Sequence, residues 1–457
     1  MIKKTLKEVE ELLGARGLAE KYYNIKIEGV STDSRQVREG QLFFPLVGES
    51  FDGHDFIEAA MAQGAAALVS SRKLEGDLPV IYVEDSLRAL QDLATAYLEE
   101  VDPVVIGITG SNGKTSTKDI LASILKRSHK THKTLGNFNN YIGLPLTILD
   151  MEADVEYAVL EMGIDHFGEM DLLSKIARPD LGLITNAGEA HLDDLGSKEN
   201  VALAKMEFLA NMKEGASYFY FKDDENLDRL SSKVPARIKV INYGLAEDSN
   251  YQVRINNLTN DGCEFTIDRL SKDPFFLPLI GRHQVLNATA AIAIADYLGI
   301  GLEDIRLGLE NVEATGMRNE LRPGRGFTIL DDSYKSNPSS LRAALDSLYS
   351  LEGYKQKIAI IGDMLGIGDN IEEMHRAIGR ELDPEKLDYL IAIGYYSEYI
   401  VWEAEKNFPA GQLIHFEEKP DNIKEVLEGL VEEGALILVK ASRPLALDTI
   451  VKDLLED

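Results

Sequence analysis

The clearest chemical pattern in the sequence is a short glycine-rich segment, Gly110-Ser111-Asn112-Gly113-Lys114-Thr115. It follows the apolar run VVIGIT directly, and the residues after it, TSTKDILASILKRS, have helical spacing. A glycine loop between a strand and a helix directs backbone N–H groups and the positive helix end at phosphate. In such a loop Lys114 contacts the outer phosphates and the Thr115 hydroxyl binds Mg²⁺. The spacing is G-x-x-G-K-T rather than the longer G-x-x-x-x-G-K-[ST], because position 108 is Ile. We therefore predict a nucleotide-binding loop of the shorter form.

Other polar residues follow apolar runs farther along the chain. Glu161 ends the strand-like run EYAVLEMG, and His191 follows the run LGLITN. The ends of strands are where open α/β sheets place their ligand sites, and Mg²⁺ prefers oxygen ligands. Taken singly, however, these residues have ordinary structural interpretations. The pattern favours a solvated carboxylate for Glu161, a capping or packed imidazole for His191, and a partly exposed amine for Lys205 in the helical stretch VALAKMEFL.

The same ambiguity holds in the last third of the chain. Asp331 and Asp332 follow the strand-like run FTIL, where they either solvate the strand end or contact a ribose or a metal. Arg318 and Arg443 lie in turn-like contexts that are more typical of surface ion pairs than of phosphate clamps. The segment GDMLGIG lacks G-x-G-x-x-G spacing, so we interpret it as a turn between a strand and a helix.

The elements that must position these residues alternate between buried strands and helices. Apolar runs ending near residues 109, 161, 184 and 221 are separated by helical patterns, which predicts a mostly parallel sheet. Residues 250–280 have a more antiparallel pattern. A second α/β unit follows the segment TGMRNELRPGRG, in which we predict a hinge near 322–326. The fold class is therefore α/β in three domains, at 1–98, 99–315 and 316–457.

Composition excludes several classes of protein. The chain has 457 residues, and 48 Lys and Arg against 77 Asp and Glu give a net charge of −29, which disfavours nucleic-acid binding. The single cysteine, Cys263, allows no disulfide within the chain, and we expect a cytoplasmic location. No apolar run approaches the roughly 18–20 residues of a membrane span, so we expect no membrane insertion. The sequence has no paired-Cys spacing and no HExxH motif, so we expect no zinc site.

Together these motifs resemble the Mur ligase family along nearly the whole chain. These enzymes are ATP-dependent, amide-forming ligases that build the peptide stem of bacterial cell-wall precursors. The resemblance rests on STDSRQVREGQLFFPLVGESFDGHDFI, GITGSNGKTSTKD, GNFNNYIGLP, LEMG, GEAHL, LIGRHQVLNATAAIAIA, TGMRNE, DDSYKSNPSSL, GDMLGIG and LVKASR. It implies a small α/β UDP-binding domain, a central P-loop-type ATPase domain with a mostly parallel sheet, and a C-terminal Rossmann-like α/β domain.

Within the family, GNFNNYIGLP, DDSYKSNP and GDML resemble the member that joins D-alanyl-D-alanine to UDP-N-acetylmuramoyl-tripeptide. Such an enzyme would work as a cytoplasmic monomer in peptidoglycan synthesis, and hence in cell shape and cell division. The tripeptide would end in lysine or diaminopimelate. The ligase that adds this third amino acid is also possible, although its DNPR-like tetrapeptide is absent. A P-loop phosphotransferase and a non-catalytic UDP-sugar-binding protein are possible as well.

The resemblance also implies roles for single residues. ATP would be bound by Gly110, Ser111, Asn112, Gly113, Lys114, Thr115, Ser116, Asn287, Arg318 and Asp332. Two Mg²⁺ ions would be held by Thr115, Glu161, His191 and Lys205, the lysine as a carbamate. The catalytic residues would be Lys114, Lys205, His191 and Arg318. The UDP pocket would contain Ser34, Arg35, Gly53 and His54, and the other substrate contacts would be Asn137, Asn139, Asn140, Tyr334 and Asn337.

The chain departs from the family pattern at a few positions. Lys335 and Ser336 stand where DDSYNANP is usual, Gly366 and Ile367 replace Glu and Leu, Ala441 replaces Gly, and Gln284 follows His283 where Asn is common. The family mechanism implies that the tripeptide carboxylate attacks the γ-phosphate of ATP and that the resulting acyl phosphate is captured by an amine. No side-chain nucleophile is needed for this reaction.

Overall fold

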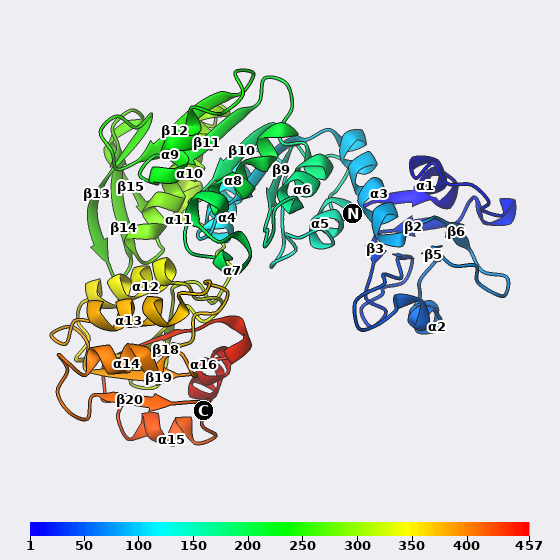
Figure 1. Ribbon diagram of the computed structural model, residues 1–457. Coiled ribbons are helices and arrows are strands. Elements are labelled where there is room, and N and C mark those ends of the chain that lie inside the picture. The colour runs from blue at the N-terminus through cyan, green and yellow to red at the C-terminus, as the bar shows by residue number, and fades with distance from the viewer. Residues whose placement is uncertain (457) are drawn as a thin grey trace.

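The computed structural model describes residues 1–456. Within this range the strands form four separate sheets (Figure 1). The N-terminal part, blue in Figure 1, contains a four-stranded parallel sheet ordered β3-β4-β5-β6 and a small antiparallel pair, β1-β2. Its helices and strands are β1 (Lys3–Thr5), α1 (Leu6–Leu12), β2 (Lys26–Glu28), β3 (Val30–Ser31), β4 (Leu42–Phe43), α2 (Ile57–Ala62), β5 (Ala67–Ser70), β6 (Val80–Tyr82) and α3 (Ser86–Val101).

The central part is built on a nine-stranded sheet ordered β15-β14-β13-β12-β11-β10-β7-β9-β8. Its strands are β7 (Val104–Thr109), β8 (Thr131–Lys133), β9 (Tyr157–Glu161), β10 (Leu181–Ile184), β11 (Ser217–Phe221), β12 (Lys239–Gly244), β13 (Tyr251–Thr259), β14 (Gly262–Ile267) and β15 (Ser271–Leu277). Its helices are α4 (Lys114–Leu125), α5 (Gly143–Leu149), α6 (Glu169–Ala177), α7 (Leu192–Leu195), α8 (Lys198–Met206), α9 (Glu225–Ser231), α10 (Arg282–Tyr297) and α11 (Leu302–Glu310). The strands from β8 to β13 pair in parallel, whereas β13, β14 and β15 pair antiparallel.

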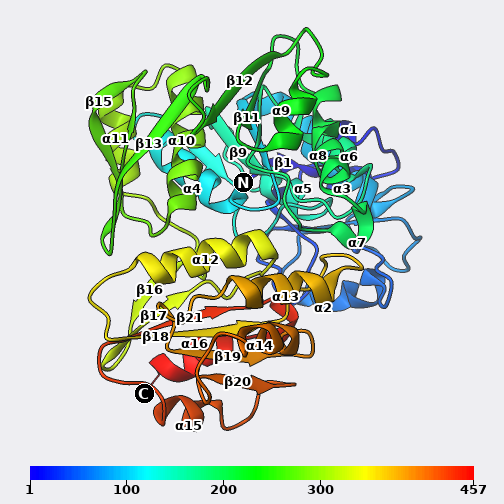
Figure 2. The same cartoon turned by 60° about the vertical axis from the view of Figure 1, so that its left-hand side comes forward.

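The C-terminal part has a six-stranded sheet ordered β16-β17-β21-β18-β19-β20, parallel except for the edge strand β16. Its elements are β16 (Glu320–Pro323), β17 (Phe327–Asp331), α12 (Pro338–Ser350), β18 (Gln356–Gly362), α13 (Ile371–Glu381), β19 (Tyr389–Ile393), α14 (Glu398–Ala404), β20 (Leu413–Phe416), α15 (Ile423–Glu428), β21 (Ala435–Lys440) and α16 (Asp448–Leu455). In Figure 2, α12 lies along the side of this part that faces the central sheet.

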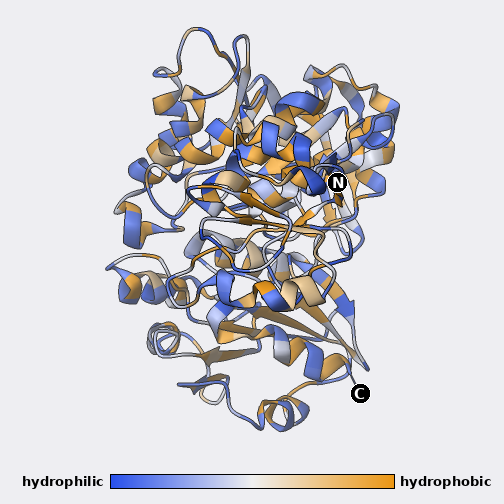
Figure 3. Ribbon diagram, turned by 90° about the vertical axis from the view of Figure 1, so that its right-hand side faces the viewer, coloured by the Kyte–Doolittle hydropathy of each residue, from blue (hydrophilic) through white to orange (hydrophobic). Residues whose placement is uncertain are grey.

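Helices cover both faces of the central sheet because its strands are apolar on both sides. The side chains of α4, α10 and α11 pack on one face, around buried Ile106, Ile108 and Leu183. Helices α5, α6 and α8 pack on the other face, around buried Ala158 and Leu160. Figure 3 shows this layering, with hydrophobic strands between helices whose outer faces are hydrophilic. The predicted α/β class with mostly parallel sheets is confirmed.

The antiparallel pattern predicted for residues 250–280 is also confirmed, by β13, β14 and β15. The predicted hinge at 322–326 is wrong. Arg322 and Pro323 belong to β16, and Gly324 N–H donates to Phe327 O at 2.9 Å in the turn that leads into β17. This segment is therefore a hairpin inside the C-terminal sheet, and the chain that links α11 of the central part to β16 is residues 311–319.

The domain boundaries at 98 and 315 stay predictions. The first predicted boundary falls inside helix α3, which continues to Val101 and is followed by Asp102 in a left-handed conformation with φ 48°. The N-terminal part contacts the central part through main-chain acceptors: Ile2 N–H donates to Leu149 O, and the Tyr97 hydroxyl donates to Met151 O, both at 2.8 Å. No helix within residues 1–456 is both long enough and apolar enough to cross a membrane.

Candidate active site

A cavity of about 1020 Å³ lies where the central and C-terminal parts meet. Parallel strands that point the same way bring their carboxyl ends to one edge of a sheet, and the loops after β7, β9 and β10 line this cavity. The C-terminal part contributes Arg318 and the loop after β17. The predicted site residues on the cavity wall are Ser111, Asn112, Gly113, Lys114, Thr115, Ser116, Asn137, Asn139, Asn140, Glu161, His191, Asn287, Arg318, Asp332 and Tyr334.

The glycine-rich loop connects β7 to α4. At two of its positions the neighbouring atoms leave no room for a side chain. Gly110 has φ 149°, and a Cβ there would lie 1.8 Å from Thr185 Oγ1. Gly113 has φ 82°, and its Cβ would lie 2.3 Å from Asn287 Oδ1. Close approach to β10 and α10 therefore requires glycine at both ends of the turn.

The start of the loop is fastened to the end of β10. Ser111 N–H donates to Asn186 O, and Asn112 N–H donates to Asn186 Oδ1, both at 3.0 Å. The N–H groups that follow, at the first turn of α4, have no acceptor within the helix. Because they point away from α4 toward the cavity side of the loop, they form a site that suits an anion.

Lys114 lies beside this turn and bends back over it. Its Nζ donates to Gly110 O at 2.7 Å, and its side chain lines the cavity. Burial lowers the pKa of Lys114 to about 8, an effect that the Glu161 carboxylate opposes. The ammonium is thus poised over the loop, where an incoming anion would replace the carbonyl as its partner.

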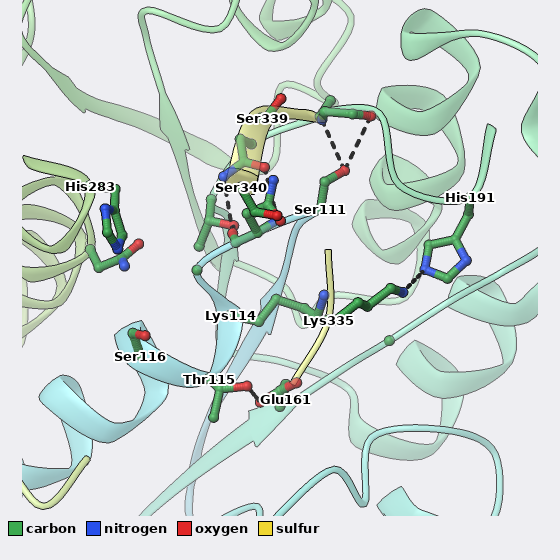
Figure 4. A pocket seen from close by; sticks show the side chains of 18 of the residues that line it. Ser111, Lys114, Thr115, Ser116, Glu161, His191, His283, Lys335, Ser339 and Ser340 are labelled. Atoms are coloured by element: carbon green, nitrogen blue, oxygen red, sulfur yellow. Dashed lines mark hydrogen bonds between the residues drawn. The ribbon is translucent and has the colours of Figure 1, made fainter. Parts of the chain in front are cut away.

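Thr115 and Glu161 bring a hydroxyl and a carboxylate together. Thr115 Oγ1 donates to Glu161 Oε2 at 2.9 Å (Figure 4). Asn139 Nδ2 donates to Glu161 Oε1 at 2.7 Å. Both Thr115 and Glu161 are 2% exposed. Two oxygen donors of this kind suit Mg²⁺. Within residues 1–456 no group of three His, Cys, Asp or Glu side chains is arranged to hold a metal ion.

His191 lies apart from that pair and has a partner on each ring nitrogen. Its Nδ1 is 2.9 Å from Asp165 Oδ1, and its Nε2 is 2.9 Å from Lys335 Nζ. Figure 4 shows Lys335 reaching from the loop after β17 to this imidazole. Burial lowers the pKa of His191, and the hydrogen bond to Asp165 opposes that change.

Lys205 is in α8 and is not part of the cavity wall. We expected a partly exposed amine, but Lys205 is 2% exposed. Burial lowers its pKa well below the usual value, and the nearby charges of Lys114 and Lys335 lower it further. The sequence interpretation failed because it assigned the polar residue of an apolar helix to the solvent side.

The cavity residues from the C-terminal part each have a different contact. The Arg318 guanidinium lies over the Tyr334 ring, with Cζ 4.4 Å from the ring centre, and its Nε is buried without a hydrogen-bond partner. Neither observation fits the surface ion pair favoured by the pattern. Asp332 accepts from Lys440 Nζ at 2.5 Å. In α10, Asn287 Nδ2 donates to Gln284 Oε1 at 3.0 Å.

Asn337 is not on the cavity wall; it joins the two parts of the protein. Its side chain accepts from Ser340 N–H at 2.9 Å and so caps α12. It also pairs with the Asn112 side chain of the glycine loop, with Asn337 Nδ2 donating to Asn112 Oδ1 at 2.8 Å. The predicted substrate contact therefore occupies an interdomain position.

The four residues predicted for the UDP pocket lie in the N-terminal part, and none is on the wall of the large cavity. They are Ser34, Arg35, Gly53 and His54. Arg35 forms a two-point contact with Asp33, both hydrogen bonds at 2.9 Å, and holds the pKa of that carboxyl at about 2. His54 Nδ1 lies 2.7 Å from Asp52 Oδ1.

Sequence reasoning missed several residues of the cavity. Lys335 stands out in the sequence only as a departure from a motif, and Asp165, His283 and Lys440 do not stand out as site residues. Asp165 follows β9 closely, so its place after a strand end was a usable signal. Lys440 gave no signal, and the spacing around Lys335 gave none beyond its departure from the motif, because a single lysine near a strand end has no distinctive spacing.

Comparison with known proteins matches family models along most of the chain. Residues 108–295 match the Mur ligase middle domain, and residues 317–443 match the glutamate ligase domain of Mur ligases. Residues 26–98 match the catalytic domain of the Mur ligase family.

One curated relative is the UDP-N-acetylmuramoyl-tripeptide–D-alanyl-D-alanine ligase of Bacillus subtilis (strain 168). It is 43% identical, with 100% of this chain and 99% of the relative covered. A crystal structure of MurF from Acinetobacter baumannii has a TM-score of 0.89 at 29% identity, with both chains covered in full. MurF ligase from Thermotoga maritima in complex with ADP has a TM-score of 0.80 at 30% identity, covering 93% of this chain and 96% of that one.

Proposed function

The chain belongs to the Mur ligase family, and on that premise we propose that it joins D-alanyl-D-alanine to UDP-N-acetylmuramoyl-tripeptide at the expense of ATP. The products are the pentapeptide precursor of peptidoglycan, ADP and phosphate. The observation that carries the proposal is the convergence of Lys114 from one domain and Arg318 from the next on a single cavity. We propose the cytoplasm as the place of action, because the reaction consumes ATP.

ATP binding at the glycine loop is supported by the loop's free N–H groups and by the cations around it. The phosphates lie along Ser111 to Ser116, with Lys114 and Arg318 on the outermost one, whereas Gly110 is not on the cavity wall. The buried, unpartnered Nε of Arg318 is a donor that such an anion would satisfy. Asn287 contacts the adenine and Asp332 the ribose, since both line the cavity.

The residues present fit one Mg²⁺ ion. The Thr115 hydroxyl and the Glu161 carboxylate are adjacent oxygen donors at the end of the loop, and Asn139 orients the carboxylate. When bound there, the ion supplies positive charge to the outer phosphates. The resemblance also implied a second ion at Glu161 and His191, oriented by carbamylated Lys205, but His191 Nε2 already has the Lys335 amine as a partner.

We further propose that Lys205 is carbamylated. A lowered pKa favours the neutral amine of buried Lys205, and this nitrogen would bond to the carbon of CO₂ with loss of one proton. The resulting anion would lie near the cationic Lys114 and Lys335. Its charge would hold those ammonium groups in place for the phosphates.

The acceptor substrates approach from the other side of the loop. We propose that Ser34, Arg35, Gly53 and His54 bind the UDP group on the N-terminal domain. Asn137, Asn139, Asn140 and Tyr334 would contact the peptide and D-alanyl-D-alanine, since all four line the cavity. Asn337 would act on these contacts through Asn112 and α12.

The chemistry needs two bond exchanges. A carboxylate oxygen of the tripeptide bonds to the γ-phosphorus as the bond to ADP breaks, which gives an acyl phosphate. The amine nitrogen of D-alanyl-D-alanine then bonds to the acyl carbon, phosphate leaves, and the amine loses a proton. Two anions must meet in the first step, so Lys114, Arg318 and the loop N–H groups act by neutralising charge and aligning the groups.

The proposal is tested by ADP release in the presence of each substrate pair. We expect release with UDP-N-acetylmuramoyl-tripeptide and D-alanyl-D-alanine together, and only background release when either is absent. Release with the dipeptide precursor and a single amino acid would identify the ligase of the preceding step instead. ADP release without any peptide substrate would identify a phosphotransferase or hydrolase.

A further inference from the structure

The loop that carries Lys335 is held on both sides. Lys440 Nζ donates to the Lys335 carbonyl at 2.9 Å and to Asp332 at 2.5 Å. Asn337 caps α12 directly after it. The backbone at Lys335 therefore has a fixed position, and its side chain extends across the cavity to the opposite domain (Figure 4).

When the Lys335 amine is charged, its contact with His191 fixes which ring nitrogen of His191 carries the proton. An ammonium has donors but no acceptor, so His191 Nε2 must present its lone pair to Lys335 Nζ at 2.9 Å. The ring proton is then on Nδ1, which donates to Asp165 Oδ1 at 2.9 Å. A carboxylate on one nitrogen and a cation on the lone pair of the other is the arrangement that metal-binding histidines adopt.

Burial lowers the pKa of Lys335, and the Asp165 carboxylate opposes that change. In its charged form Lys335 occupies the one atom of His191 that could bind a metal. Within residues 1–456, Lys335 Nζ has His191 Nε2 as its hydrogen-bond partner, so its remaining N–H donors are available to a ligand in the cavity. A divalent ion on the same lone pair would also lie against an ammonium. Repulsion between these charges makes the two cations mutually exclusive.

We propose that the Lys335 ammonium replaces a second metal ion in this enzyme, and that it contacts the oxygens of the transferring phosphoryl group while His191 and Asp165 hold it in place. This inference rests on the proposed function. It gives Lys335 a catalytic role and leaves the pair Thr115 and Glu161 to hold the single metal ion. It also accounts for a lysine in a motif that usually has asparagine at this position.

The test counts bound metal rather than turnover. Mn²⁺ is titrated into the full chain with a non-hydrolysable ATP analogue, and free Mn²⁺ is measured by electron paramagnetic resonance. We expect a single nucleotide-dependent Mn²⁺ per wild-type chain. Lys335→Asn frees His191 Nε2 and should gain a second Mn²⁺, which Lys335→Asn combined with His191→Ala should lose again. The Lys335→Arg chain keeps the positive charge and should still bind one Mn²⁺.

Two results would overturn the inference: a wild-type chain that binds two Mn²⁺, one of them lost in His191→Ala, or a Lys335→Asn chain that still binds only one. Before bound Mn²⁺ is counted, circular dichroism checks that each variant is folded. An analogue that does not bind the wild-type chain, with or without Mn²⁺, is a separate result. It would refute the proposed ATP site, and the inference would fall with it.

Discussion

At the residue scale, Lys114 links the loop to its proposed ligand, since it is the only cation on the wall that is part of the loop itself. Lys114→Met keeps most of the side-chain volume but removes the charge. We expect ADP release with all substrates present to fall by about 10²–10³-fold, the usual cost of removing a group that stabilises transition-state charge. Release within a few-fold of wild type would contradict the assignment.

Lys205 makes a different prediction, because its proposed anion comes from outside the chain. Lys205→Ala should lose activity, and small carboxylates such as formate or acetate should restore part of it by supplying the missing negative charge. The control is Lys114→Met, which the same carboxylates should not rescue. Full activity of Lys205→Ala without additives would show that no carbamate is needed.

His283 predicts a pH dependence of stability. Burial lowers its pKa to about 4, and Asp332 opposes that change. In the unfolded chain its pKa is about 6.5. Below that pH the unfolded state takes up a proton that the folded state does not, so the free energy of unfolding falls between about pH 6.5 and 4.

The slope contributed by one such proton is about 1.4 kcal/mol per pH unit. Urea unfolding of wild type and His283→Gln across this range checks it. We expect the free energy of unfolding of the variant to change less steeply with pH, because the contribution of this one proton is absent. Parallel curves would show that His283 is protonated alike in both states.

Sequence patterns predicted single residues well where a motif fixed their spacing. Lys114 and Thr115 line the cavity as the glycine loop implied, with Glu161 beside Thr115. Patterns failed for residues whose role depends on a distant partner. Lys335 meets His191 across 144 positions of sequence, and no local spacing encodes such a contact.

At the element scale, α12 couples the C-terminal sheet to the glycine loop through Asn337. Asn337→Ala removes the helix cap, which should lower stability by about 1 kcal/mol. It also removes the contact with Asn112. Asn337→Asp separates the two effects, because the carboxylate still accepts from Ser340 N–H but cannot donate to Asn112.

We therefore expect urea unfolding to show near wild-type stability for Asn337→Asp and reduced stability for Asn337→Ala. Both variants should bind nucleotide more weakly than wild type. If Asn337→Asp binds nucleotide as tightly as wild type, the contact between α12 and the loop has no functional part.

The longer elements could be predicted because their apolar runs are continuous. Strands β7, β9, β10 and β11 are buried on both faces, and that burial leaves a strong pattern in the sequence. Short strands such as β8 and β20 are only partly buried and gave no comparable run. The segment Arg322–Gly326 was misassigned because a glycine- and proline-rich hairpin and a linker share the same composition.

At the scale of the whole molecule, four of the polar contacts between the two catalytic domains lie on the side of the cavity. The pairs are Asn112 with Asn337, His191 with Lys335, Glu189 with Ser339, and Asp193 with Gly368. All four are polar, and each of the first three includes a residue of the cavity wall. Such contacts form and break at low cost, so we expect ligands to favour the closed arrangement.

Small-angle scattering measures this closure directly. Nucleotide and UDP-tripeptide together should reduce the radius of gyration relative to the free protein, because the free protein also samples open arrangements. Lys335→Asn should need more ligand for the same change, since it loses one of the four contacts. Identical profiles with and without ligands would rule out closure as a part of function.

The central claim is that the enzyme activates a carboxylate as an acyl phosphate before an amine captures it. The direct measurement uses UDP-N-acetylmuramoyl-tripeptide labelled with ¹⁸O in its terminal carboxylate and follows the label by mass spectrometry of the released phosphate. The acyl-phosphate route predicts that one carboxylate oxygen is transferred to phosphate in each turnover. Phosphate whose new oxygen comes from water would contradict the account.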